Sequence, residues 1–130
     1  MTPRTEDAMG SFDEGMAMRR RVLGDAHVDM AGERTTGLDE AFQTWITESI
    51  WGGIWARDGL DIKTRSMITI AVLAALGHEE LELHLRAAAN TGVSTEEIAE
   101  ILLHVTAYAG APAGNRAFRV TKTIYEEDQK

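Results

Sequence analysis

The sequence predicts an all-α fold, a single domain built as a bundle of six helices. Apolar residues recur at intervals of three and four, clusters of Gly, Asn and Asp separate the periodic runs, and no segment alternates apolar and polar residues as a strand does. A chain of 130 residues with 44% hydrophobic residues can bury one sizeable core but not two. We expect the polar residues 1–10 to form a flexible tail and residues 11–130 to form the domain.

The first two expected helices lie on either side of a linker. The first covers residues 12–23 and ends at Gly24, and residues 25–37 are expected to be a linker. The second begins near Asp39 and reaches Trp51 or Trp55. It crosses the pair Gly52-Gly53, where two adjacent glycines predict a kink or a close backbone approach.

The other four helices have clearer end signals. The third begins after the N-cap candidate Asp61 and ends at Gly77, and the fourth covers residues 79–90. The fifth opens with a capping box, Ser94 with Glu97, and runs to about residue 108. The sixth begins at Pro112, a good first-turn residue, and ends among acidic residues 126–128.

The third helix is apolar on nearly every side, which predicts that it is buried all round. A chain this small has few helices with which to surround it, so part of its cover is expected to come from another subunit. The sequence therefore predicts a homo-oligomer. The apolar residues are Ile62, Met67, Ile68, Ile70, Val72, Leu73 and Leu76.

Composition excludes several classes of function. The formal net charge of -8 argues against general affinity for nucleic acid or for an anionic membrane surface. The absence of cysteine excludes disulfides, thiolate nucleophiles and zinc–thiolate sites. The longest apolar run, residues 67–77, is too short for a membrane span, and residues 1–10 lack the apolar core of a signal peptide. We expect a cytoplasmic protein.

His84 is the first candidate for chemistry. It falls in the apolar stripe of the fourth helix, and Glu80 lies four residues earlier, where its carboxylate could hold one imidazole nitrogen and orient the other. The alternative is a core histidine satisfied by a backbone carbonyl.

Arg65 is the second candidate. It lies in the first turn of the third helix, where the helix dipole disfavours cations, on the same face as apolar residues. An inward arginine beside a helix N-terminus would bind an anion. The alternative is a buried salt bridge to Glu48 or Asp29.

The remaining candidates are aromatic or imidazole side chains. Trp51 and Trp55, four residues apart, would form an apolar wall. This wall would lie in the core, in a contact between subunits or in a substrate pocket. His104 borders the apolar stripe of the fifth helix, and His27 lies in the expected linker, where a solvated, silent histidine is the alternative. Their spacing supports no metal site.

Six segments in a fixed order resemble the 4-carboxymuconolactone decarboxylase family over about residues 12–120. They are 22–29 (VLGDAHVD), 42–47 (FQTWIT), 51–57 (WGGIWAR), 64–66 (TRS), 81–88 (LELHLRAA) and 108–113 (YAGAPA). Asp58 stands where the family pattern has proline. The wider alkylhydroperoxidase D-like superfamily includes peroxidases with a CxxC motif, which a chain without cysteine cannot be.

The resemblance implies an alkylhydroperoxidase D-like helical fold and a ring-forming homo-oligomer, commonly a hexamer. It also implies cofactor-independent decarboxylation of a small anionic lactone in the protocatechuate branch of the β-ketoadipate pathway. We expect His84, Arg65 and His27 to be catalytic and the substrate to meet Trp51, Trp55, Arg57, Glu80 and His104, with no metal. Two alternatives stay open: a different lactone or keto-acid enzyme on this scaffold, and a non-catalytic helical assembly or ligand-binding module.

Overall fold

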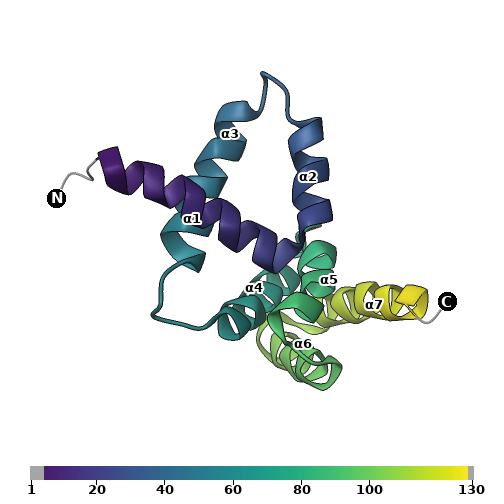
Figure 1. Ribbon diagram of the computed structural model, residues 1–130. Helices are drawn as coiled ribbons and strands as arrows, with labels where there is room; N and C mark the ends of the chain where they lie inside the picture. Colours follow the sequence, from purple (N-terminus) through teal and green to yellow (C-terminus); the bar gives the residue numbers. More distant parts are fainter. Residues whose placement is uncertain (1–4, 129–130) are drawn as a thin grey trace. The chain divides into compact units, whose positions relative to one another are not determined.

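The computed structural model describes residues 5–128, with side chains from residue 11 to residue 127. Over this part of the chain it contains seven α-helices, one π-helix and no strand, which confirms the all-α prediction (Figure 1). The helices form two compact units, divided between Leu60 and Asp61. No helix of the described residues is long and apolar enough to cross a membrane.

The N-terminal unit contains α1 (Thr5–Leu23), α2 (Asp25–Arg34), α3 (Glu40–Trp45) and the π-helix η1 (Ile46–Trp55), which continues directly from α3. α1 packs against η1 so closely that the backbones of the two helices are in van der Waals contact. Glycine permits this approach, because a Cβ at Gly15 would lie 1.9 Å from the Thr47 carbonyl oxygen and one at Gly52 would lie 2.1 Å from the Ser11 carbonyl oxygen. The close approach predicted at Gly52 is confirmed.

The C-terminal unit contains α4 (Ile62–Leu76), α5 (Leu81–Thr91), α6 (Thr95–Ala109) and α7 (Ala111–Asp128). Its core gathers one apolar face from each helix, as amphipathic periodicity predicts. The buried residues are Ile70, Ala74, Leu81, Leu85, Ala88, Val93, Ile98, Leu102, Val105, Ala117 and Ile124. The helix ends at Gly77 and Gly92 use left-handed backbone, with φ of 69° and 84°.

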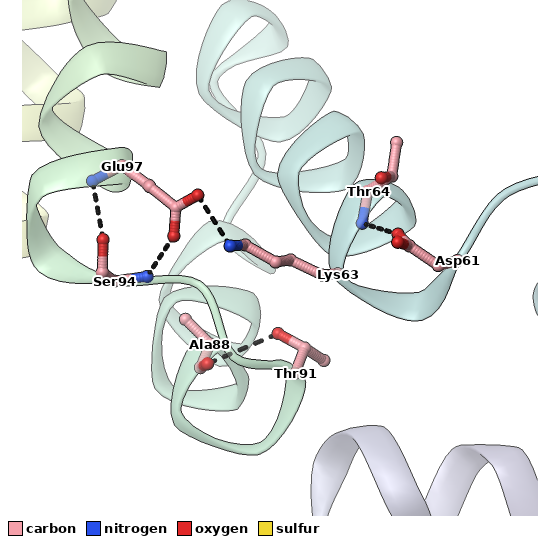
Figure 2. A network of polar contacts seen from close by, with 7 residues as sticks. All are labelled: Asp61, Lys63, Thr64, Ala88, Thr91, Ser94 and Glu97. Atoms are coloured by element: carbon pink, nitrogen blue, oxygen red, sulfur yellow. Dashed lines mark hydrogen bonds and ion pairs between the residues drawn. The ribbon is translucent and has the colours of Figure 1, made fainter.

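Carboxylates fix the first turns of α4 and α6, as the sequence predicts (Figure 2). Asp61 accepts a hydrogen bond from the Thr64 amide at 2.7 Å. Ser94 and Glu97 form the complete capping box. Glu97 also pairs with Lys63, with 2.9 Å between Nζ and Oε2, so the cation in the first turn of α4 has the negative partner that the helix dipole requires.

The six-helix expectation is wrong, because residues 25–34 of the expected linker form α2 and the expected second helix is divided into α3 and η1. α1 also begins at Thr5, seven residues before the predicted start. Residues 1–4 of the expected flexible tail lie outside the described residues, and the flexibility of residues 5–10 stays a prediction. The single domain also stays a prediction.

The expectation that the third helix is buried all round is wrong for the isolated chain. Ile68, Val72 and Leu76 of α4 are 47%, 47% and 65% exposed. Together with α6, this face forms an open apolar groove of about 620 Å³. The helix is apolar all round, as the sequence indicates, but one of its faces has no cover within the described chain.

Candidate active site

A cluster of polar side chains in the N-terminal unit is centred on Arg19 of α1. The Arg19 guanidinium donates to Gln43 Oε1 at 3.1 Å and to Thr47 Oγ1 at 3.4 Å. The Thr47 hydroxyl donates its own proton to the Gln43 carbonyl at 2.8 Å, so its oxygen is left to accept from Arg19. The Nε of Arg19 is buried and meets no acceptor among the described residues. Burial lowers the pKa of Arg19.

Arg20, the next residue, has a different environment. It forms ion pairs with Asp25 at 3.1 Å and with Asp29 at 2.8 Å, both from α2. These carboxylates raise the pKa of Arg20, chiefly through the hydrogen bond to Asp29. The two acidic side chains of α2 nearest this corner are therefore bound to Arg20, and Arg19 makes hydrogen bonds to neutral groups only within the described chain.

His27 lies in α2 rather than in a loop, which corrects the sequence-based expectation. Its side chain is partly buried. Burial is the larger cause that lowers the pKa of His27, and the positive charge of Arg19 is the second. The lowered pKa favours the neutral form of His27, and its role in the chemistry stays a prediction.

Trp51 and Trp55 are both buried in η1 and stack on each other, with ring centroids 5.0 Å apart and an angle of 28° between the planes. Thr47, four residues before Trp51, is also buried, so residues spaced by four share the inner face of η1. Arg57 follows η1 and is exposed. The two tryptophans form a buried, stacked apolar pair, and their expected role as a wall of the substrate pocket stays a prediction.

In the C-terminal unit, His84 is buried in α5 at 9% exposure, among Leu81, Leu85 and Ala88. Glu80 is the N-cap residue of this helix, and its carbonyl accepts the His84 amide at 3.1 Å. The Glu80 side chain is exposed. The expected pairing of its carboxylate with the His84 ring stays a prediction.

Arg65 occupies the first turn of α4 and is partly buried, with its Nε shielded from solvent. Fewer free backbone N–H groups lie beside it than expected, because the Asp61 carboxylate already accepts a hydrogen bond from the Thr64 amide. Asp61 also places a negative charge at this helix start. Arg65 is followed by the fully buried Ser66, whose hydroxyl accepts from Thr91 Oγ1 at 2.8 Å.

His104 lies on α6, away from the core, and stacks on Tyr108 with ring centroids 5.0 Å apart. Both side chains line the apolar groove between α4 and α6. Almost all of the surface that lines this groove is apolar. Among the side chains of residues 11–127, no three His, Asp or Glu gather closely enough to hold a metal ion.

Comparison with known proteins gives the family. A model of the carboxymuconolactone decarboxylase family matches residues 40–123, which is more than half of the chain. The chain belongs to this family.

Two relatives of this decarboxylase family match most of the chain. The 4-carboxymuconolactone decarboxylase of Acinetobacter baylyi is 42% identical over 117 residues, covering 89% of this chain and 87% of that protein. The nitrosuccinic acid decarboxylase of Metarhizium robertsii is 43% identical over 117 residues, covering 87% of this chain and 80% of that protein. An uncharacterised 15.0 kDa protein of Paracoccus denitrificans is 31% identical over 88 residues, covering 65% of this chain and 66% of that protein.

The family model begins after α2, but the two decarboxylase relatives extend further. A match to 87% or more of 130 residues necessarily includes residues 19–47, and hence the whole Arg19 cluster. Sequence reasoning missed Arg19, Gln43 and Thr47, although residues 42–47 belong to the segments that resemble the family. The only local signal is a run of three arginines in α1, of which Arg20 alone forms ion pairs in the described structure.

Proposed function

We propose that this chain catalyses the cofactor-independent decarboxylation of 4-carboxymuconolactone to the β-ketoadipate enol-lactone, in protocatechuate catabolism. The observation that carries the proposal is 42% identity to the Acinetobacter decarboxylase over 89% of the chain. As a member of the same family, the chain is a carboxy-lyase.

The substrate's own structure explains how this reaction proceeds without a cofactor. The bond between the ring carbon and the departing carboxylate breaks, and its electron pair spreads through the C=C bond onto the lactone carbonyl oxygen. A proton then adds to the ring carbon next to that carbonyl. The protein has to bind the carboxylate that stays, stabilise the dienolate oxygen and supply the proton.

We assign these tasks to the residues that the sequence singled out. His84 is the proposed proton donor, and His27 is the second candidate. Arg65 binds the remaining carboxylate or stabilises the developing oxyanion. Trp51 and Trp55 provide an apolar wall against which the departing carboxylate is less solvated. Arg57, Glu80 and His104 are proposed to contact the substrate.

A second candidate is decarboxylation of nitrosuccinic acid, favoured by 43% identity to the Metarhizium enzyme. Nitrosuccinic acid is also a dicarboxylic acid, and one carboxyl group lies on the carbon that bears the nitro group. Loss of CO₂ then places the electron pair on the nitro oxygens. Both reactions make the same demands on the protein: a cation for one carboxylate, donors for a developing oxyanion and a proton for carbon.

We also propose that the chain works as a cytoplasmic homo-oligomer, a ring and most simply a hexamer, as the family resemblance implies. The exposed apolar face of α4 supports self-association, since burial of Ile68, Val72 and Leu76 in a second copy would remove apolar surface from water. Sedimentation at working concentration tests this, and a stable monomer of 14.3 kDa would contradict it.

The decisive experiment for the function is a turnover assay on chelator-treated protein with each of the two substrates. The measured quantity is the release of CO₂. We expect turnover of 4-carboxymuconolactone without added metal or organic cofactor. Higher kcat/KM on nitrosuccinic acid would select the second candidate. No turnover of either substrate by a folded, assembled protein would favour the two remaining alternatives, a different lactone or keto-acid enzyme and a non-catalytic helical module.

A further inference from the structure

Arg19 has more hydrogen-bonding capacity than its surroundings use. A guanidinium has five N–H donors, and the acceptors that Arg19 meets in the described structure are an amide oxygen and a hydroxyl oxygen. Its Nε is buried and meets no acceptor in the part of the chain that the structure describes. A partly buried cation in such surroundings is costly unless a negative group completes them. The nearby Asp25 and Asp29 do not fill this role, because both are paired with Arg20.

The elements around Arg19 hold it in place. Gln43 belongs to α3, Thr47 to η1 and Arg19 to α1, so the guanidinium bonds to both of the consecutive helices that face α1. The close backbone approach at Gly15 fixes the distance between α1 and the Thr47 peptide. The cation is therefore preorganised, and an incoming anion would not need to order a flexible side chain.

We propose that Arg19, rather than Arg65, is the substrate-binding residue that holds the carboxylate retained in the product, so that of the two roles open to Arg65 the oxyanion contact remains. The identity of the carboxylate rests on the proposed function, whereas the presence of an anion site rests on the Arg19 cluster itself. A cation on the departing carboxylate would stabilise the ground state and lose its partner as CO₂ leaves, which would slow the reaction. Arg19 therefore suits the carboxylate that keeps its charge throughout.

This arrangement gives His27 a role in proton uptake. The charge of Arg19 helps to keep its imidazole neutral in the unliganded protein. A carboxylate bound to Arg19 would offset that charge and raise the pKa of His27. Substrate binding would then favour proton uptake from solvent by His27, beside the bound anion.

The sharpest test is Gln43→Glu, which has nearly the same shape and places a carboxylate at the position now 3.1 Å from Arg19. The new carboxylate would pair with Arg19 and compete with the substrate. We expect a 10–100-fold higher KM for the turned-over substrate, kcat within about threefold of wild type, and an unchanged or higher Tm. A purely structural role for Arg19 predicts no loss of affinity, because the contact between the helices is retained or strengthened.

Arg19→Gln is the second variant and Arg21→Gln its matched control, because Arg21 is an exposed arginine of the same helix. Binding of succinate, an unreactive dicarboxylate, is measured by calorimetry on wild type and all three variants. We expect weaker binding, by tenfold or more, in Arg19→Gln and Gln43→Glu and binding within twofold of wild type in Arg21→Gln.

The outcomes separate this proposal from the proposed function. If the wild type turns over neither substrate, the proposed function fails, and succinate binding that depends on Arg19 still supports the anion site. If succinate binding and KM in folded Gln43→Glu and Arg19→Gln equal those of wild type, the anion site is overturned even for an active enzyme. Failure of the wild type to bind succinate, together with an unchanged KM in both variants, would also overturn it.

Discussion

Replacing Gly15 by alanine tests the packing of α1 on η1 that positions the Arg19 cluster. A Cβ at this position would lie 1.9 Å from the Thr47 carbonyl oxygen and 2.8 Å from the Gly52 nitrogen. Real Cβ contacts are not shorter than 3.0 Å, so the two helices would have to separate by about 1 Å. Both obstructing atoms belong to the backbone and cannot rotate away.

The expected loss of stability follows from two opposing effects. Overpacking of a well-packed contact costs about 1–3 kcal/mol, and rigid backbone partners place this site at the upper end. Alanine in place of glycine within a helix recovers about 1 kcal/mol. The net expectation is a destabilisation of about 2 kcal/mol, which corresponds to a fall in Tm of roughly 5–10 °C for a chain of this size.

Gly32→Ala in α2 is the matched control, since no described atom outside its chain neighbours and its own helix backbone lies within 4 Å of the Cβ that it would add. It should gain up to about 1 kcal/mol from helix propensity alone. Thermal unfolding, monitored by circular dichroism at equal protein concentrations, gives the Tm of both variants. A Gly15→Ala variant that melts at or above the wild-type temperature would refute the close approach. Since the Thr47 peptide would move, kcat/KM should fall in the same variant.

Three further predictions concern a helix cap, the proposed proton donor and a titration. Ser94→Ala removes half of the capping box and should cost about 1 kcal/mol in chemical denaturation, with no change in kcat. His84→Gln should lower kcat by roughly 10²–10⁴ while the chain still folds, and a normal single-turnover rate would remove His84 from the mechanism. In Arg19→Gln, NMR should show the His27 ring titrating at higher pH than in wild type, because one of the two causes that lower its pKa is gone; an unshifted titration would show that Arg19 does not influence it.

The C-terminal unit was predicted well because its signals are local. Asp61, Ser94 with Glu97, and the terminal glycines define helix ends through contacts between near neighbours in the chain. The α2 helix was missed because it is short, contains Gly32 and buries only Val28, so its sequence shows little amphipathic pattern. The π-helix was missed because no residue type or spacing in the sequence indicates an i→i+5 hydrogen-bond register.

The candidate site was harder to predict for a physical reason. Arg19 and Arg20 are adjacent and chemically identical, and only the folded chain shows that one pairs with Asp25 and Asp29 while the other meets Gln43 and Thr47. The choice depends on contacts across 24 and 28 residues for Arg19. Helical periodicity reports the face on which a side chain lies but not its partner on another helix.

The Asp61 and Glu97 carboxylates, which accept backbone hydrogen bonds at the starts of α4 and α6, make these two caps sensitive to acid (Figure 2). The hydrogen bond to Thr64 lowers the pKa of Asp61, and the contact with Lys63 is the largest cause that lowers the pKa of Glu97. A carboxyl group whose pKa falls on folding stabilises the folded chain above its unfolded pKa, which is about 4 for both residue types, and loses that contribution as the pH falls through the folded value. Acidification below about pH 4 therefore weakens the caps at the first turns of α4 and α6, the two helices that line the apolar groove.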